Sequence, residues 1–311
     1  MPSSSSFRVA LLTSGFVAHT ALAYTQVNVP TPFMNKNIDP IVFPGSYTSH
    51  LHSFYRSDAV TASTSSSDEL RSGCTNAENP NDLSTYWTPA VLYQSGDGSW
   101  QPAPVMRFSA YYGLGDTPAE VPFPENLMMV AGNATATTPE EMPAEANSEW
   151  FCEDADLFDT FAAAPLLPQL PYKAGRPGAY YECPSGMQAM PRLRFSIRYD
   201  LREVLPSGWS GTAPVMLASG NAFCSHGDFI HGWTDEGGIN LVAAMASKDE
   251  YLSVNGALGY DGDVMDCVAV DADPENGTSD YADSVEMKSK RSIPAFGWSS
   301  KSRFARSVRR M

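Results

Sequence analysis

The clearest indication of fold class in this sequence is the segment Leu193-Arg194-Phe195-Ser196-Ile197-Arg198-Tyr199. Apolar and polar side chains alternate along it, and this period of two is typical of a strand with one buried and one solvated face, as in an antiparallel sheet. Further strands are expected within Val91–Tyr112, around a turn at Ser95–Gly98, and at Pro214–Ser219; a helix is expected at Asn240–Leu252. We predict a mainly β protein: a single antiparallel β-sandwich or jelly-roll-like domain with long loops and few short helices.

The composition supports a folded chain built from short strands. Of the 311 residues, 43% are hydrophobic and only 18% are charged, which argues against wholesale disorder. The 24 prolines and 23 glycines suit strands that are joined by turns. The net charge of −15 argues against nucleic acid as a partner of the folded body.

The first 23 residues resemble a secretory signal peptide. Arg8 precedes an apolar run from Val9 to Leu22, and Ala21-Leu22-Ala23 has the small-residue pattern of a cleavage site. The apolar run is shorter than the ~20 residues that span a bilayer. We therefore expect a mature protein that starts near Tyr24, has no transmembrane segment, and is secreted to the extracellular space or the cell surface.

Two further sequence features agree with secretion. In an oxidising compartment, widely spaced cysteines are candidates for disulfides. The candidates here number five, so one remains unpaired, and their spacing does not determine the pairing: Cys74, Cys152, Cys183, Cys224 and Cys267. Asn133-Ala134-Thr135 and Asn276-Gly277-Thr278 are sequons that predict glycosylation at Asn133 and Asn276.

The charge distribution divides the chain into an acidic body and a basic tail. Residues 24–284, the expected β-rich domain, carry 11 basic and 34 acidic residues, whereas residues 285–311 carry eight basic residues and one acidic residue. Such a tail is usually solvated and disordered. Alternatives are contact with an anionic surface, such as a membrane or a wall polysaccharide, or folding back on the acidic body.

The remaining candidate chemistry lies in two histidine clusters, His50/His52 and His226/His231. On a strand, His50 and His52 point to one face, and so do His226 and Asp228. If the two segments meet, His50, His52, His226 and Asp228 form either a divalent metal site, suited to Zn²⁺, Mn²⁺, Fe²⁺ or Cu²⁺, or a metal-free acid–base site. The plain alternative is that these residues form hydrogen bonds that hold turns in place.

Aromatic and basic residues extend the possible site. Tyr86, Trp87 and Trp233 could stack on sugar rings if they are exposed, although a single tryptophan more often packs in a core. Arg107 or Arg194 could bind a sugar carboxylate. The sequence has no G-x-S-x-G, H-E-x-x-H, Walker or Rossmann motif.

An ordered series of motifs resembles a secreted, mainly fungal family known as domain of unknown function nineteen ninety-six, sometimes joined to WSC modules. The series covers about residues 37–267 and is as follows: Asp39-Pro40-Ile41-Val42, Pro44-Gly45, Ser49-His50-Leu51-His52, Tyr86-Trp87-Thr88-Pro89, Leu127–Gly132, Cys183-Pro184, His226-Gly227-Asp228-Phe229 and Gly232-Trp233. The resemblance implies secretion and a candidate site at His50, His52, His226 and Asp228, which match signature positions. It implies no reaction.

This sequence departs from the family pattern in two places. The family usually has Asn at the position of His231, and the stretch between Cys152 and Cys183 is shortened and lacks a Cys-Trp-Asp-Gly segment. Any function that depends on the missing segment therefore does not carry over to this chain.

Three functional hypotheses follow. The first is a carbohydrate-active enzyme, a lyase or hydrolase on extracellular or cell-wall polysaccharide, which predicts a deep groove that contains both histidine clusters. The second is a metal-binding secreted protein, which predicts at least three of the four site residues around one ion. The third is a non-enzymatic surface or wall protein, which predicts that His50 and His226 are buried and bonded to the backbone, with no open cleft beside them.

Overall fold

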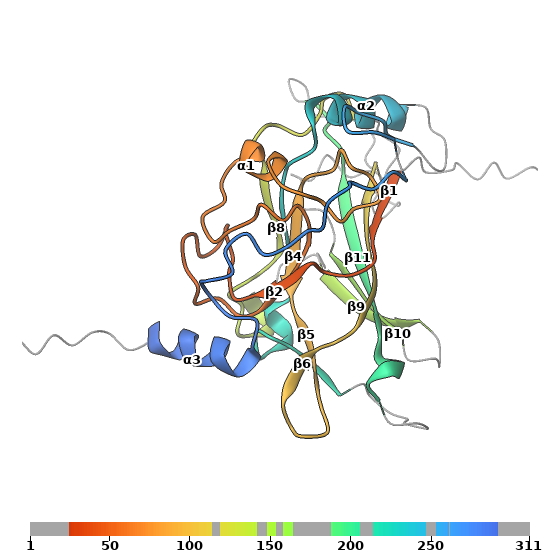
Figure 1. The fold of residues 1–311 in the computed structure, drawn as a ribbon. Coiled ribbons are helices and arrows are strands. Elements are labelled where there is room, and N and C mark those ends of the chain that lie inside the picture. Colours follow the sequence, from red (N-terminus) through yellow and green to blue (C-terminus); the bar gives the residue numbers. More distant parts are fainter. Residues whose placement is uncertain are drawn as a thin grey trace, which may run out of the picture.

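The computed structural model describes residues 25–113, 119–141, 148–153, 158–163, 188–205, 214–246, 253–260 and 262–291. The signal-like segment, Cys183 and residues 292–311 lie outside these ranges, and the side chain of Cys152 is not described. Within the described ranges the protein is mainly β, with strands in three antiparallel sheets and three short α-helices (Figure 1), so the predicted fold class is confirmed.

The first sheet contains the strands β1 (Thr25–Val29), β7 (Val105–Tyr112), β11 (Leu193–Asp200), β10 (Phe158–Ala163) and β9 (Ser148–Glu153), in that spatial order. The expected strand is β11, and its side chains alternate strictly between buried and half-buried positions. Its odd positions, such as Phe195 and Ile197, enter the main hydrophobic core. The sequence period of two therefore identified the buried face correctly.

The second sheet, of three strands, and the third sheet, of five, follow the same antiparallel pattern. In spatial order the second contains β12 (Val215–Leu217), β5 (Val91–Gln94) and β6 (Trp100–Pro102). The third contains β2 (Met34–Lys36), β3 (His52–Arg56), β4 (Thr85–Pro89), β13 (His226–Ile230) and β8 (Met128–Gly132). The turn expected at Ser95–Gly98 joins β5 and β6.

The third sheet is buried on both faces. Tyr55, Tyr86 and Phe229 point to one side and pack in the main core with Phe108 and Phe195 of the first sheet. The neighbouring residues along the same strands point to the other side and form a second cluster, which includes Phe54, Trp87 and Ile230. The residues that precede these in β3 and β13 by two positions are His52 and Asp228, so the candidate site lies on this outer face.

The helices are short and lie around the sheets. They are α1 (Ser67–Arg71), α2 (Asp235–Ala246) and α3 (Tyr281–Arg291), with 3₁₀ turns η1 (Pro139–Glu141), η2 (Leu201–Glu203) and η3 (Ala222–Cys224). The helix expected at 240–252 begins earlier, because Thr234 Oγ1 accepts a hydrogen bond from the Gly237 N–H and Asp235 and Glu236 complement the helix dipole. Residues 247–252 lie outside the described ranges. None of the described helices has the length and apolarity that a membrane crossing requires.

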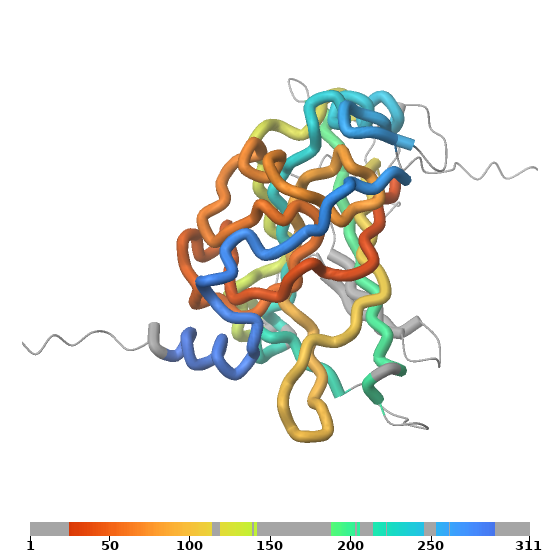
Figure 2. The backbone as a smooth tube through the Cα atoms, in the orientation of Figure 1, coloured from red at the N-terminus to blue at the C-terminus, as the bar shows by residue number. Residues whose placement is uncertain are grey.

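The C-terminal segment, residues 262–291, runs beside the edge strand β2 and the loops next to it, where the blue tube passes in Figure 2. A disulfide joins Cys267 to Cys74, and Lys36 Nζ lies 2.7 Å from Asp271 Oδ2. The Thr278 N–H donates to Asn37 Oδ1 at 2.7 Å. The segment ends in α3, so residues 285–291 of the stretch that the sequence assigned to a basic tail are helical.

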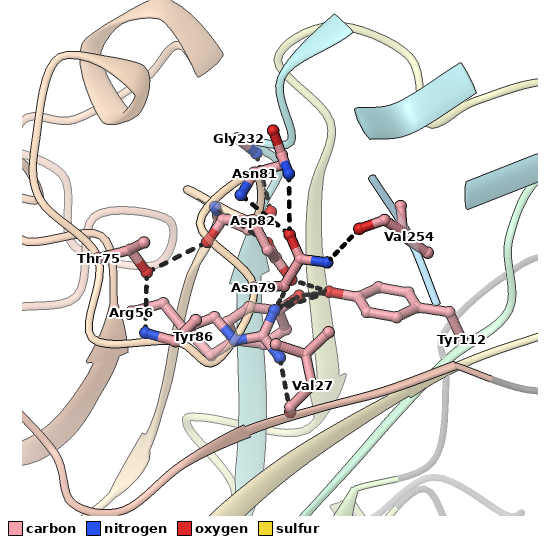
Figure 3. Close-up of polar contacts among 12 residues, drawn as sticks. Val27, Arg56, Thr75, Asn79, Asn81, Asp82, Tyr86, Tyr112, Gly232 and Val254 are labelled. Carbon is pink, nitrogen blue, oxygen red and sulfur yellow. Dashed lines mark hydrogen bonds and ion pairs between the residues drawn. The ribbon is translucent and has the colours of Figure 1, made fainter. Parts of the chain in front are cut away.

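A buried arginine joins three parts of the chain on the side of the third sheet that faces the first sheet (Figure 3). Arg56, at the end of β3, forms a fully buried ion pair with Asp82, and its Nη1 donates to Tyr112 Oη at 2.9 Å. Its Nη2 donates to the Val27 carbonyl at 3.1 Å. Tyr112 also donates to Asp82 Oδ2 at 2.6 Å. These bonds tie β3 of the third sheet to β1 and β7 of the first.

Candidate functional site

The two histidine segments meet on the outer face of the third sheet. His52 pairs with Pro89 of β4, and the register of β13 on β4, continued from Asp228 opposite Trp87, places His226 opposite Pro89 from the other side. The two histidines therefore lie on the same face, separated by one intervening strand. Adjacent strands are ~4.8 Å apart, so two imidazoles that lean toward each other can meet above β4.

The imidazole rings do converge. His226 Nε2 lies 3.2 Å from His52 Nε2 and 3.3 Å from His50 Nε2. A second ring atom of His226, Nδ1, is hydrogen-bonded to Asp228 Oδ2. The structure thus brings together the four residues that the sequence placed in one site, all of them buried.

Asp39 is a fifth member that sequence reasoning did not assign to the site. It lies in the loop after β2, and its Oδ2 is 3.9 Å from His52 Nε2. Its other oxygen, Oδ1, accepts a hydrogen bond from the Val42 N–H at 3.0 Å. Its place in the signature stretch was the available signal. We refer to Asp39, His50, His52, His226 and Asp228 as the His–Asp cluster.

Two carboxylate oxygens of the cluster have no hydrogen-bond partner among the described residues. They are Asp39 Oδ2 and Asp228 Oδ1, and both are buried from solvent. A buried acceptor without a partner is costly, since it has lost its water and gained nothing in exchange. Their position beside three imidazoles indicates a place for a cation or an ordered water.

The protonation tendencies in the cluster differ from residue to residue. Burial, with the nearby charges of His226 and Lys288, holds the pKa of His50 well below its ordinary value. Burial, with the charges of His50 and His226, does the same for His52. Burial also lowers the pKa of His226, but the carboxylates of Asp228 and Asp39 outweigh it, so that this pKa is raised. His50 and His52 are therefore neutral near pH 7, with ring lone pairs available to a ligand.

The two carboxylates are also shifted. Burial raises the pKa of Asp228 to about 6 against the opposing effect of His226. Burial likewise raises the pKa of Asp39, again opposed by His226. Because the Asp228 carboxylate accepts the hydrogen bond, His226 Nδ1 carries the proton; in the neutral imidazole the Nε2 lone pair then faces the other two imidazoles. A carboxylate that orients an imidazole in this way is the usual second contact of a metal-bound histidine.

A pocket of about 460 Å³ lies beside the cluster and reaches one of its members, His50. The other lining residues include Ser49, Thr135 and Lys288, while His52, His226 and Asp228 lie behind its wall. Among the described residues, this pocket therefore differs from the deep groove that was expected to contain both histidine clusters. His50 is the residue that connects the pocket to the cluster.

Several other sequence predictions are corrected by the structure. Tyr86, Trp87 and Trp233 are fully buried, so they do not form an exposed stacking surface for sugars; they pack in the two hydrophobic clusters. His231 points to the opposite face of β13 from His226, beside Phe123 and Phe229, and does not join the cluster.

The remaining predicted residues lie elsewhere. Arg107 and Arg194 belong to the first sheet and do not line the pocket. Cys224 is a buried free thiol that lines the pocket, while Cys74 and Cys267 form the disulfide. The sequon residues Asn133 and Asn276 are described, and their glycosylation remains a prediction.

The chain can be assigned to a family. The family described as Domain of unknown function (DUF1996) matches residues 39–177 and 169–233. The chain belongs to the DUF1996 family. The match contains the whole His–Asp cluster, and it confirms the resemblance in the motifs, although it ends at residue 233 rather than near 267. The two segments of the DUF1996 match meet within the stretch from Cys152 to Cys183, which is where the sequence departs from the family pattern. No curated protein and no solved structure matches the chain.

Proposed function

We propose that this DUF1996 protein is a secreted metalloprotein in which His50, His52 and His226 bind one transition-metal ion. The observation that carries the proposal is that His226 Nε2 lies 3.2 Å from His52 Nε2 and 3.3 Å from His50 Nε2, with one ring nitrogen of each histidine within 4.8 Å of the other two. Ligand nitrogens at ~2.0–2.1 Å from a tetrahedral ion lie about 3.3–3.4 Å apart, so His226 is already close to the separation from each of the other two imidazoles that Zn²⁺ requires.

The surroundings of the three nitrogens support the same proposal. Asp228 orients His226 through Nδ1, and the orphan oxygens of Asp39 and Asp228 place negative charge near the ion. Three protein ligands leave a fourth position, which is the arrangement of catalytic rather than structural zinc sites. An ion with such a position can activate water or polarise a bound oxygen.

A carbohydrate-active enzyme, a lyase or hydrolase on extracellular polysaccharide, is the second candidate function. The pocket beside His50 favours it over a purely structural role, because the non-enzymatic hypothesis required that no cleft adjoin the buried histidines. The cluster could serve that activity with the ion or, without it, through His50, the member that lines the pocket, as the group that transfers the proton.

Secretion is part of the proposal. The signal-like segment before Tyr24 supports it, and so does the disulfide between Cys74 and Cys267, since structural disulfides persist in oxidising compartments. When the wild-type gene is expressed, we expect the protein in the culture medium. N-terminal sequencing of that protein should show that the first 23 residues have been removed. Accumulation inside the cell with an intact N-terminus would contradict it.

The metal proposal is tested by elemental mass spectrometry on the folded, secreted protein. We expect close to one equivalent of metal in the wild type and almost none in the His50→Ala/His52→Ala variant. His231→Gln is the matched control, because His231 is a buried histidine of the same strand region that lies outside the cluster. Replacement by Co²⁺ should give the intense visible absorption of a tetrahedral site.

Three results would reject the metal centre. They are absence of metal from a folded wild type that also fails to take up added Zn²⁺, equal metal content in the double variant, and loss of metal in His231→Gln alone. If metal is absent and the double variant is only less stable, the cluster has the structural role of the third hypothesis.

A further inference from the structure

The pocket beside His50 has an unusual charge for this protein. The chain has a net charge of −15, yet the pocket lining contains no aspartate or glutamate among the described residues. It contains one lysine, Lys288, which α3 carries to the pocket edge. No carboxylate of the described residues lies within ion-pair distance of Lys288. Within the part of the chain that the structure describes, the cation therefore lines the pocket without a carboxylate partner.

The rest of the lining is suited to a sugar. Five hydroxyl side chains and one amide surround the pocket: Thr48, Ser49, Thr135, Thr137, Ser219 and Asn221. Phe43, Ala134 and Ala136 supply apolar surface, which suits the C–H face of a pyranose ring. The volume, about 460 Å³, lies in the range of ~300–1,000 Å³ that small-molecule sites occupy.

One of these hydroxyls has no partner of its own. Ser49 is 1% exposed, and its Oγ makes no hydrogen bond within the part of the chain that the structure describes. It stands next to His50 in the chain and lines the same pocket. A buried hydroxyl that is left unpaired in the protein is a hydrogen-bonding group available to a ligand.

We propose that this pocket binds the acidic sugar unit of a uronate-containing oligosaccharide, with Lys288 holding the carboxylate and Ser49 bonding a ring oxygen beside His50. The proposal goes beyond the metal centre, since it depends on the pocket lining and not on an ion. It also assigns the carboxylate-binding role to Lys288 instead of Arg107 or Arg194, which the sequence had suggested and which lie on another sheet.

The position of Lys288 is determined by the rest of the C-terminal segment. Asn37 Nδ2 contacts Met287 Sδ at 3.3 Å, and Ser284 of the same helix is buried. Upstream, the disulfide at Cys267 and the Lys36–Asp271 ion pair hold the segment on the sheet. The helix is thus held by contacts that a substitution at the exposed Lys288 leaves in place.

The experiment measures binding of short uronate oligosaccharides by isothermal titration calorimetry. The probes are trimers of galacturonate, glucuronate and mannuronate, each beside its methyl ester, which keeps the sugar and removes the charge. We expect at least one acid to bind and its ester to bind at least about tenfold more weakly, the loss of one charge-assisted hydrogen bond. The difference should shrink as salt is raised, because the Lys288 contact is partly screened.

Three variants test which residues cause the preference for acid over ester. Lys288→Gln should remove the preference for acid over ester, and Ser49→Ala should weaken acid and ester by a similar factor. Arg107→Gln is the matched loss of charge away from the pocket and should bind like the wild type. Equal binding of acid and ester by the wild type, a wild-type preference in Lys288→Gln, or no binding of any trimer would overturn the proposal.

Two further measurements separate this proposal from others. Displacement of the trimer by an equal concentration of inorganic sulfate would mean that the pocket recognises anions and not sugars, and would overturn the sugar assignment. Metal content is measured on the same samples. If the Lys288→Gln variant keeps its metal but no longer prefers acid over ester, the result supports the sugar pocket independently of the metal centre. If the wild type contains no metal and still prefers the acid, only the metal centre is rejected.

Discussion

His52 and His226 belong to strands that are separated by β4, yet their Nε2 atoms lie 3.2 Å apart. The contact crosses the sheet above Pro89, and it brings together residues 174 positions apart in the sequence. Because β3, β4 and β13 share one ladder of backbone hydrogen bonds, the distance between the two imidazoles is determined by sheet geometry. The contact between His52 and His226 is therefore as rigid as the sheet that carries both residues.

Replacement of Asp228 by Asn should weaken metal binding without removing a ligand. The amide is neutral and cannot orient and polarise His226 as the carboxylate does, and such second contacts are worth about 10–100-fold in metal affinity. The measurement is competition for Zn²⁺ with a chromophoric chelator at pH 7. An affinity equal to that of the wild type would show that Asp228 does not support the ligand.

Gly132 should be required for the position of His226. Its φ is +87°, and a Cβ at this residue would lie 2.2 Å from the Ser225 carbonyl oxygen, next to the His226 backbone that it pairs with. Gly132→Ala should therefore cost both stability and metal affinity. Gly98→Ala is the control, since Gly98 has a similar φ of +88° and a Cβ there would meet only Gln94 Nε2, at 4.0 Å.

The control separates backbone strain from the steric clash. Both variants place a side chain in the left-handed region, at a cost of about 1 kcal/mol. Only Gly132→Ala also pushes β8 away from β13, so its free energy of unfolding in urea should fall further and its metal affinity should fall with it. If both variants lose the same free energy of unfolding and the same metal affinity, the close approach of Gly132 to the Ser225 carbonyl is not what makes Gly132 necessary.

His231 should make the protein less stable in mild acid. Burial lowers its pKa to about 4, whereas its pKa in the unfolded chain is near 6.5. The unfolded chain therefore takes up this proton first, and the free energy of unfolding falls as the pH drops from about 6.5 toward 4. Between pH 7 and pH 5 the loss from this residue is about 2 kcal/mol.

The comparison with His231→Gln isolates that loss from the other titrating groups. Urea unfolding at pH 7 and at pH 5 should show a smaller decrease in the variant than in the wild type. A decrease of the same size in both proteins would mean that His231 remains protonated in the folded state or is solvated there.

Replacing one partner of the Arg56–Asp82 ion pair should lower the stability of the fold strongly. Both side chains are fully buried, so Arg56→Met leaves an uncompensated carboxylate in the core and should lower the free energy of unfolding by about 3–5 kcal/mol. Arg202→Met, which breaks an exposed pair with Asp200, should change it by less than about 1 kcal/mol. The double variant Arg56→Met/Asp82→Leu should cost less than the two single changes added together; additivity would show that the pair is not coupled.

Local sequence patterns were sufficient for some of the strands and for four of the five residues of the cluster, all but Asp39. The alternation in Leu193–Tyr199 identified β11 and its buried face, because a period of two has one structural meaning when the polar residues are charged. The spacing of His50 with His52 and of His226 with Asp228 identified side chains on one face. That these two faces coincide depended on strand pairing, which no local pattern contains.

The pocket could not be predicted in the same way. Its lining comes from the loop before β3, the loop after β8, the region around η3 and α3, so no single segment carries a recognisable spacing. Lys288 was hidden in a basic stretch that is typical of disorder, and the contacts that order α3 come from residues such as Asn37, far away in the sequence. The tryptophans were misleading for a related reason, because composition does not distinguish a buried ring from an exposed one.

The cross-link between Cys74 and Cys267 encloses most of the chain. A protease that cuts once between them releases no fragment, since the two pieces stay joined through sulfur. His52 then sits on one piece and His226 on the other when the cut falls between them, and the sheet ladder still holds the two together. If the protein is secreted as proposed, a single cut by an extracellular protease between the two cysteines thus leaves its centre assembled.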